Sequence, residues 1–269
     1  MREQNFKAAH TELARSLARQ MSAFVDEVII PNESLLAEAG EVSLRLQVDL
    51  MNKARLVGLC GLFYPLSHGG KIASLEDYLI VAEQEGRTEF SQTIFGSHTA
   101  LDAHMLLKFG NEAIRRQFLE PMVTGDAIPS YGMTEPGHSG SIPSLITTTA
   151  QLSNGSWHIN GRKWFISNAD RATFMTALVR TAGADIALNS ALTMIIVPMD
   201  TPGVKIERQL TMMGHSYGQG EISFTAVQVP EHNLLGAYGS GLDLMNKRLG
   251  LGRLLRAMNW IGLAQRCMD

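Results

Sequence analysis

The feature that most constrains this chain is a change of texture near Ile128, close to the middle of its 269 residues. Before that point apolar residues recur at helical spacing. After it, short segments rich in Thr, Val, Ile and aromatic residues alternate with turn residues. A chain of this length forms one large domain or two small ones, at about 100–200 residues per domain. The pattern predicts an α+β protein whose helices and strands occupy separate domains.

The first half reads as helices. One helix is expected to close over Ala23–Ile30 and to stop at Pro31, and a second is expected over Leu44–Leu59. The sequence from Ser74 to Asp77 has the form of a capping box, in which each side chain would bond the other residue's backbone. A further helix is expected over residues 90–108, and Asn111 is the N-cap candidate of the next one.

Two Asn-Gly pairs organise the second half. Asn154-Gly155 and Asn160-Gly161 separate the strand candidates Thr147–Ser153, Ser156–Ile159 and Arg162–Ser167. Asn-Gly is the strongest signal for a two-residue hairpin, so the pairs predict an antiparallel meander. Further strands are expected at Phe174–Arg180, Thr193–Pro198, Val204–Arg208 and Ile222–Val229. Together these strands predict a small antiparallel barrel or sandwich.

From Gly241 the chain turns helical again. Its apolar stripe must dock on something, so we expect a chain that is cut or lacks a partner. The stripe comprises Leu251, Leu254, Leu255, Met258 and Ile261. The domains predicted are a helical domain over 1–128, a β domain over 129–236 and the first helix of a truncated helical domain over 237–269.

Composition narrows the function. The net charge is −3 with acidic and basic residues well mixed, which disfavours a nucleic-acid partner. No apolar run approaches the ~20 residues of a membrane span, and no secretory signal is recognisable. Two cysteines suit a reducing compartment. The compartment expected is the cytoplasm in a bacterium or, in a eukaryote, the mitochondrial matrix or peroxisome.

The common catalytic motifs do not occur. The sequence contains no GxGxxG after a strand, no Walker A, no GxSxG and no HxxxH, so no metal site is predicted. What remains is a stretch dense in hydroxyls, glycines and aromatics, running from Tyr131 to Ser141. Gly and Ser in such a turn expose backbone N–H groups and hydroxyls, which suit an anionic phosphate.

Four motifs in order resemble the acyl-CoA dehydrogenase family. Tyr131-x-x-Thr134-Glu135-Pro136-Gly137 resembles its flavin loop, and the segment 159–168, INGRKWFISN, resembles its second flavin motif. The motifs Met213-Gly214-His215 and those of 222–236 resemble the end of its β domain, and 262–266 its first C-terminal helix. The resemblance implies FAD as cofactor and a fatty acyl-CoA as substrate, dehydrogenated between Cα and Cβ with hydride transfer to flavin N5.

The resemblance also implies site residues. Those expected at FAD are Tyr131, Met133, Thr134, Gly140, Ser141, Phe165, Ile166 and Ser167, and those expected at the substrate are Ser141 and Arg253. Ser167 takes the place of a hydroxyl that approaches N5. The loop TEPGHSGS is one residue longer than the usual TEPGxGS, so two registers of Ser139, Gly140 and Ser141 remain open.

None of these residues is a credible catalytic base. The family's usual glutamate is expected beyond Asp269, and the position of a minority alternative is Gly252, which has no carboxylate. Electron-transfer flavoprotein is the implied electron acceptor and a homodimer or homotetramer the implied assembly. The alternatives are an acyl-CoA oxidase or nitroalkane oxidase, or a non-catalytic subunit that binds flavin or acyl-CoA and completes a site with a partner.

Overall fold

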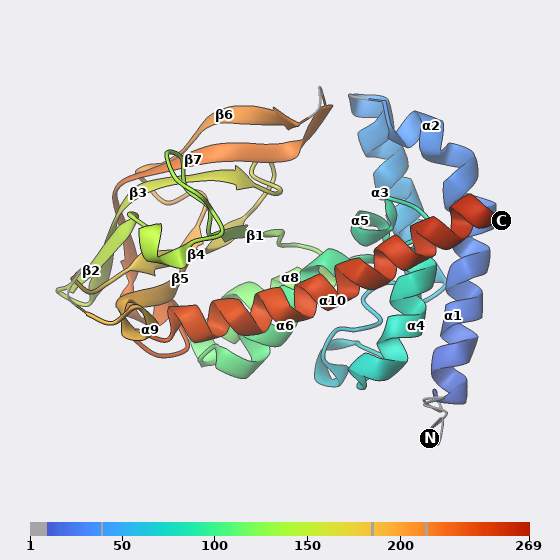
Figure 1. Ribbon diagram of the computed structural model, residues 1–269, viewed down its shortest axis with the longest axis horizontal. Helices are drawn as coiled ribbons and strands as arrows, with labels where there is room; N and C mark the ends of the chain where they lie inside the picture. The colour runs from blue at the N-terminus through green and yellow to red at the C-terminus, as the bar shows by residue number, and fades with distance from the viewer. Residues whose placement is uncertain (1–9, 39, 184–185, 213–214) are drawn as a thin grey trace, which may run out of the picture. The chain divides into compact units, whose positions relative to one another are not determined.

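The computed structural model describes residues 10–38, 40–183, 186–212 and 215–269 (Figure 1). The chain divides into two compact units, the first made of residues up to Leu101 together with Gly250–Asp269, the second of Asp102–Leu249. The boundary falls within two helices, α6 (Ser97–Phe109) and α10 (Gly241–Met268). The three domains expected from the sequence are not tested by this division and stay a prediction.

The first unit is helical. Its other helices are α1 (Glu12–Phe24), α2 (Glu33–Leu36), α3 (Glu41–Leu56), α4 (Leu75–Glu85) and α5 (Ser91–Phe95). Helix α1 packs beside α4 (Figure 1), and the core is filled by fully buried residues such as Met21, Leu50 and Phe95.

Two helix ends of the first unit differ from expectation. Pro31 does not stop the first helix: a π turn over Val25–Ile29 and a 3-10 turn over Ile30–Asn32 carry the chain on to α2. Proline is tolerated there because the first turn of a helical element needs no N–H donor. The helix expected over 90–108 is two helices, since Gly96 adopts a left-handed φ of 69° between them.

Only one of the two hydrogen bonds of the capping box at α4 forms. Ser74 Oγ accepts a hydrogen bond from the Asp77 N–H at 3.4 Å, as predicted. The Asp77 carboxylate does not return to Ser74. It accepts from the backbone N–H and the hydroxyl of Thr11, at 3.0 and 2.9 Å. A partner 66 residues away therefore replaces the local one.

The end of α10 belongs to the core of the first unit. Leu255 is buried there, and Leu251 and Met258 pack against it, so this part of the stripe is covered within the chain itself. Leu254 and Ile261 remain exposed. Close approach is possible because Gly262 has no side chain: a Cβ there would lie 1.8 Å from the Glu83 carbonyl oxygen. The expectation that the stripe needs an outside partner is corrected to that extent.

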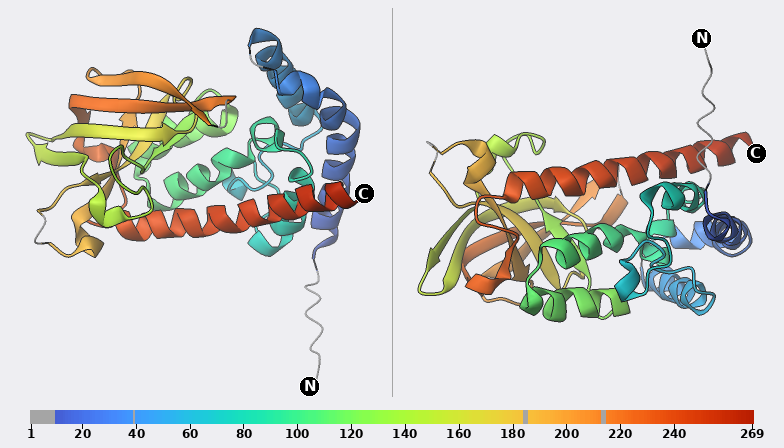
Figure 2. Two further views of the ribbon diagram at one scale, coloured as in Figure 1. Left: turned by 45° about the horizontal axis from the view of Figure 1, so that its top comes forward. Right: turned by 90° about the horizontal axis from the view of Figure 1, so that it is seen from below.

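The second unit is built on one sheet. Its strands are β1 (Pro129–Gly132), β2 (Thr149–Ser153), β3 (Ser156–Ile166), β4 (Phe174–Arg180), β5 (Leu192–Pro198), β6 (Val204–Met212), β7 (His215–Pro230) and β8 (Leu234–Leu235). The order is β6-β7-β3-β2-β4-β5-β8, with β1 paired to β4. Strands β3, β7 and β6 run side by side (Figure 2). Among its described residues, this unit also contains the short helices α7 (Glu112–Ile114), α8 (Glu120–Thr124) and α9 (Leu188–Ala191).

The mainly antiparallel β domain expected from the sequence is confirmed, with one departure. Strand β4 runs parallel to β1 and to the start of β2. The buried face of the sheet carries Trp157, Ile159, Met175, Ile195 and Ile222. Asn111 caps α7 by accepting from the Ile114 N–H at 2.9 Å, as expected.

The two Asn-Gly pairs have different structures. Asn154 and Gly155 both take positive φ, 51° and 73°, and close the two-residue hairpin between β2 and β3. Asn160-Gly161 is not a turn, and the second hairpin is wrong. Strand β3 runs through it with a register shift, and Asn160 Oδ1 accepts a hydrogen bond from Ala226 N–H on β7 at 2.8 Å. The neighbouring strand, not the dipeptide, decides the conformation.

Among the described residues, no helix combines the length and apolarity needed to cross a bilayer.

Candidate functional site

The two flavin-like motifs, about 30 residues apart in sequence, lie together in the second unit. The Trp164 N–H donates to the Thr134 carbonyl at 3.0 Å, and the Thr134 hydroxyl donates to the Trp164 carbonyl. This reciprocal pair ties the loop after β1 to the end of β3. Because its proton is used in this way, the Thr134 hydroxyl offers a ligand only an acceptor lone pair.

Phe165 is turned out of the sheet by a β-bulge. Lys163 pairs with Ile222 and Ile166 with Gly220, so Trp164 and Phe165 face one residue of β7. Phe165 takes φ 51°, a left-handed conformation that costs energy for a bulky residue, and the residue is 40% exposed. Strain of this kind concentrates at ligand sites, so it favours a functional reading of this exposed aromatic.

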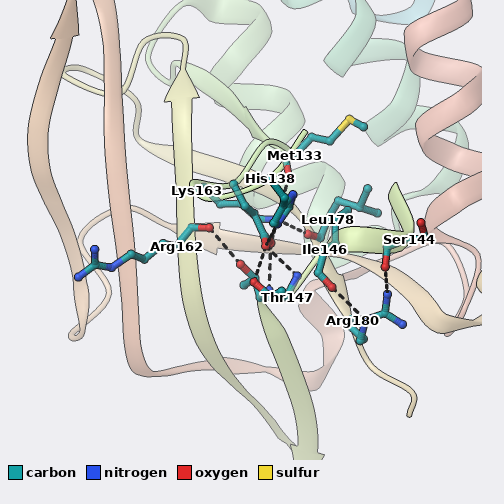
Figure 3. A network of polar contacts seen from close by, with 11 residues as sticks. Met133, His138, Ser144, Ile146, Thr147, Arg162, Lys163, Leu178 and Arg180 are labelled. Atoms are coloured by element: carbon teal, nitrogen blue, oxygen red, sulfur yellow. Dashed lines mark hydrogen bonds and ion pairs between the residues drawn. The ribbon is translucent and has the colours of Figure 1, made fainter. Parts of the chain in front are cut away.

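A buried ion pair, Lys163 with Glu135, anchors the loop that follows β1. Lys163 Nζ donates to Glu135 Oε1 at 2.8 Å, to the Met133 carbonyl at 3.1 Å and to the Leu178 carbonyl at 2.7 Å (Figure 3). All three ammonium protons are therefore used. The Lys163 side chain is 0% exposed and that of Glu135 1%.

Glu135 also closes the loop on itself. Its carboxylate accepts from the backbone N–H groups of Thr147 and Thr148, at 2.7 and 2.9 Å, and from the Thr147 hydroxyl at 2.7 Å. His138 Nε2 lies 3.2 Å from the same carboxylate. Burial alone would raise the pKa of Glu135, but the charge and hydrogen bond of Lys163 outweigh it and lower the pKa to about 2.

The second half of the loop is held by Arg180 at the end of β4. Its guanidinium donates to the Ile146 carbonyl at 2.9 Å and to the Ser144 carbonyl at 2.8 Å (Figure 3). Two cations from the sheet, Lys163 on β3 and Arg180 at the end of β4, therefore fix the loop between residues 133 and 146. A loop held this way presents its outer groups in a set geometry.

The predicted site residues fall into three groups. Ser141, Phe165 and Ser167 are exposed, while Tyr131, Met133, Thr134 and Gly140 are half-buried along the same loop. The Ile166 side chain points into the core, so only its backbone is open to a ligand. Arg253 is exposed on α10 and belongs to the first unit, while the other predicted residues belong to the second. The Met213-Gly214 part of the third motif lies outside the described residues.

Sequence reasoning missed the cations that support the site. Lys163 could have been found, because it continues the inward alternation of Trp157 and Ile159 and a lysine there needs a buried partner. Nothing in the sequence distinguishes Arg180, or Arg248 on α10, from a solvated charge. Arg248 donates to the Asp102 carboxylate at 3.1 and 2.9 Å. Within the described residues no cluster of three or more His, Cys, Asp or Glu could hold a metal ion.

Comparison with known proteins agrees with this architecture. Residues 11–126 match the model of the acyl-CoA dehydrogenase N-terminal domain, and residues 130–227 match that of the middle domain. A solved structure assigned as an acyl-CoA dehydrogenase, from Mycobacterium abscessus, shares 31% identity with a TM-score of 0.83. That comparison covers 96% of this chain and 68% of the other.

Curated relatives bear the same description. Human acyl-CoA dehydrogenase family member 11 is 34% identical over 254 residues, and an acyl-CoA dehydrogenase of Bacillus subtilis is 30% identical over 236. The matches cover 91% and 87% of this chain but only 32% and 61% of those proteins. By its two domain matches, its relatives and its fold, the chain belongs to the acyl-CoA dehydrogenase family.

Proposed function

We propose that this chain forms the flavin-binding side of an enzyme that dehydrogenates a fatty acyl-CoA thioester between Cα and Cβ, with FAD as cofactor. The observation that carries the proposal is the reciprocal hydrogen-bond pair between Thr134 and Trp164. It joins two motifs, separated in sequence, into one surface of the kind that a large planar ligand requires.

The residues on this surface suit a flavin. The exposed ring of Phe165 supplies an aromatic contact, and the half-buried Met133 supplies an apolar one. The Tyr131 hydroxyl is buried and has no hydrogen-bond partner among the described residues, so it can take a polar atom of a ligand. Ser139 and Ser141, whose hydroxyl oxygens lie 2.9 Å apart, give an anionic group several polar contacts.

Each residue has a proposed role. Thr134 and the adjoining backbone hold the polar edge of the flavin ring, and the Ser167 hydroxyl donates to flavin N5. Ser141 lies by the pyrophosphate and the acyl-CoA, and Arg253 serves the substrate. When bound, FAD supplies the hydride acceptor at N5.

The α proton of a thioester needs a base, and Glu135 does not suit that role. It is buried, it accepts hydrogen bonds from Lys163, Thr147 and Thr148, and its pKa, which burial alone would raise, is lowered to about 2 by Lys163. A carboxylate so well bonded holds a proton poorly and has no free path to a substrate. The family resemblance places the base beyond Asp269, and we keep that as the proposal.

For the substrate and the electron acceptor we propose only a chemical class or type of protein. A fatty acyl-CoA is the proposed substrate, and electron-transfer flavoprotein the proposed acceptor of the electrons. An oxidase of the same family would instead pass them to dioxygen. A non-catalytic subunit would bind flavin or acyl-CoA without turnover.

The test uses the full protein, purified and supplied with FAD. It should bind FAD and, mixed anaerobically with acyl-CoA, lose the absorbance of the oxidised flavin. Ser167→Ala should keep its FAD and slow this bleaching by about two- to tenfold, since it loses one hydrogen bond of ~0.5–1.5 kcal/mol. Ser153→Ala, in the exposed hairpin between β2 and β3, is the matched control.

The other outcomes separate the alternatives. A protein that stays colourless with FAD refutes the proposal. Flavin that binds but never bleaches with any acyl-CoA indicates a binding subunit. Bleaching followed by rapid recovery in air indicates an oxidase.

A further inference from the structure

Three residues of the second unit form a contact that the proposed function has not used. The Arg248 guanidinium lies over the Tyr131 ring, with Cζ 4.1 Å from the ring centroid. The same guanidinium makes two hydrogen bonds to Asp102: Nε to Oδ1 at 3.1 Å and Nη2 to Oδ2 at 2.9 Å. Two parallel bonds of this kind fix the plane of the guanidinium.

This ion pair is shielded from water. The side chains of Arg248 and Asp102 are 14% and 7% exposed. Removing two charges from water costs roughly what their attraction returns, so a shielded pair is weak evidence for stability alone. Its geometry indicates a different use, because a fixed flat cation on one face of a ring restricts how that ring can turn.

The ring held by the pair ends in a hydroxyl that has no hydrogen-bond partner among the described residues. Tyr131 Oη is buried and makes no hydrogen bond with any residue that the structure describes. Burial also raises the pKa of Tyr131 above its ordinary value, so the hydroxyl keeps its proton and is a donor at neutral pH. A buried donor in a native structure normally meets an acceptor.

Tyr131 lies at the start of the flavin-like loop, two residues before Met133. A ligand in that loop is therefore the natural source of the acceptor. We propose that Asp102 and Arg248 are positioning residues that hold Tyr131, so that its hydroxyl donates a hydrogen bond to a carbonyl oxygen of the bound ligand. This rests on the proposed function, which supplies two such ligands: the isoalloxazine ring of FAD and the thioester of an acyl-CoA.

The experiment compares variants of the full protein for binding of two probes. The first is FAD, followed by fluorescence quenching and by its visible spectrum. The second, with FAD bound, is 2,2-dimethylbutyryl-CoA, which cannot be dehydrogenated because it has no α proton. The variants are Tyr131→Phe, Arg248→Gln, Arg248→Lys and Asp102→Asn, and the control is Arg116→Gln at an exposed arginine of the same unit.

Tyr131→Phe should bind one probe three- to tenfold more weakly and change the spectrum of the bound flavin. Weaker FAD binding identifies the isoalloxazine carbonyl, and weaker binding of the CoA ester alone identifies the thioester. Arg248→Gln and Asp102→Asn should reproduce the loss with Tyr131 intact. Arg248→Lys should not rescue it, because lysine keeps the charge but has no plane to stack. Arg116→Gln should bind within twofold of the wild type.

A double-variant cycle tests positioning directly. In the Tyr131→Phe background, Arg248→Gln should add less than twofold, because the hydroxyl that it positions is already gone. Effects that multiply, or a Tyr131→Phe protein with unchanged affinities and spectrum, would overturn the proposal. Tyr131→Phe deletes only a hydroxyl that bonds none of the residues the structure describes, so its melting temperature should not fall and its result does not depend on misfolding. Wild-type protein that binds neither probe would overturn the proposed function together with this inference, whereas normal wild-type binding with unaltered variants overturns the inference alone.

Discussion

Glu85 in the helical unit and Glu135 in the β unit are both almost inaccessible, with 2% and 1% exposure, yet their surroundings differ. Glu85 accepts from the Tyr78 hydroxyl at 2.8 Å, a residue of the same helix, α4. Glu135 accepts from Lys163 on β3 and from the loop residues Thr147 and Thr148. Burial raises the pKa of Glu85 to about 7, whereas for Glu135 the Lys163 charge overcomes burial and lowers the pKa to about 2.

The difference shows what a buried carboxylate does once a distant segment supplies a cation. Glu135 remains ionised and joins three segments far apart in sequence, which shapes the loop that carries the proposed flavin contacts. Glu85 accepts from the Tyr78 hydroxyl of its own helix, the Ser97 hydroxyl at the start of α6 also favours its charged form, and no ion pair with it is found among the described residues. Glu135 therefore stays charged and fixes the conformation of the loop, whereas Glu85 titrates near neutral pH.

Breaking the ion pair should have the largest effect. Lys163→Met leaves Glu135 buried without its cation, so we expect a loss of about 3–5 kcal/mol in the unfolding free energy. Urea unfolding followed by tryptophan fluorescence measures it, since Trp157 and Trp164 both lie on β3. Lys205→Met on β6, where the lysine side chain is 69% exposed, should change stability by less than about 0.5 kcal/mol. Equal effects of the two substitutions would show that the Lys163–Glu135 pair stabilises the fold no more than an exposed lysine does.

The decrease in unfolding free energy at acidic pH should depend on Glu135. A carboxyl whose folded pKa is lowered stabilises the fold above its unfolded pKa, near 4.5, and that contribution is lost as pH falls toward 2. At 1.36 kcal/mol per pKa unit, the wild type should lose roughly 3 kcal/mol there. Glu135→Gln, although less stable at neutral pH, should not show this loss of stability as the pH falls. Parallel curves for wild type and variant between pH 5 and 2 would contradict the assignment.

Glu85 should give the opposite sign. A carboxyl whose folded pKa is raised favours the fold fully below the unfolded pKa, and this contribution is lost as pH rises from about 4.5 through about 7. Glu85→Gln keeps an acceptor for Tyr78 but cannot ionise, so it should be about 2 kcal/mol more stable than the wild type at pH 8. The gain should vanish near pH 4.5. Thermal melting of both proteins across this range measures it, and a constant difference at every pH would refute the titration of Glu85.

The same contrast between local and non-local partners explains how far the sequence could predict the fold. Asn154-Gly155 forms its hairpin because two positive φ angles are a local property. Asn160-Gly161 does not, because β7 offers Asn160 a backbone donor at Ala226. Asp77 was expected at Ser74 and binds Thr11 instead. Helices and strands with strong periodicity were found, and errors lie where a distant segment competes for a polar group.

The candidate site was predictable in its outer residues only. Thr134 and Phe165 stand out through the resemblance of their motifs, which needs no knowledge of packing. Their supports, Lys163 and Arg180, act through carbonyls and a carboxylate brought close only by the folded sheet. No pattern along the chain marks Asp102 and Arg248 as a pair, because 146 residues separate them.

The smallest predicted effect distinguishes a threonine of the site from one of the helical core. Thr134 donates to the Trp164 carbonyl, and Thr99 in α6 donates to the Gly96 carbonyl at 2.7 Å. Valine at Thr134 removes one hydrogen bond and should lower stability by about 0.5–1.5 kcal/mol. Valine at Thr99 should lower it by at least as much, because the Thr99 hydroxyl also bonds the Tyr64 hydroxyl at 2.5 Å. Thr134→Val should also weaken FAD binding three- to tenfold, because it loosens the joint between the loop and β3 and removes an acceptor, whereas Thr99→Val should bind FAD as the wild type does. Fluorescence titration with FAD, beside urea unfolding of both variants, measures the two effects separately. Equal FAD affinities for the two variants would mean that the joint between the flavin-like motifs is structural alone.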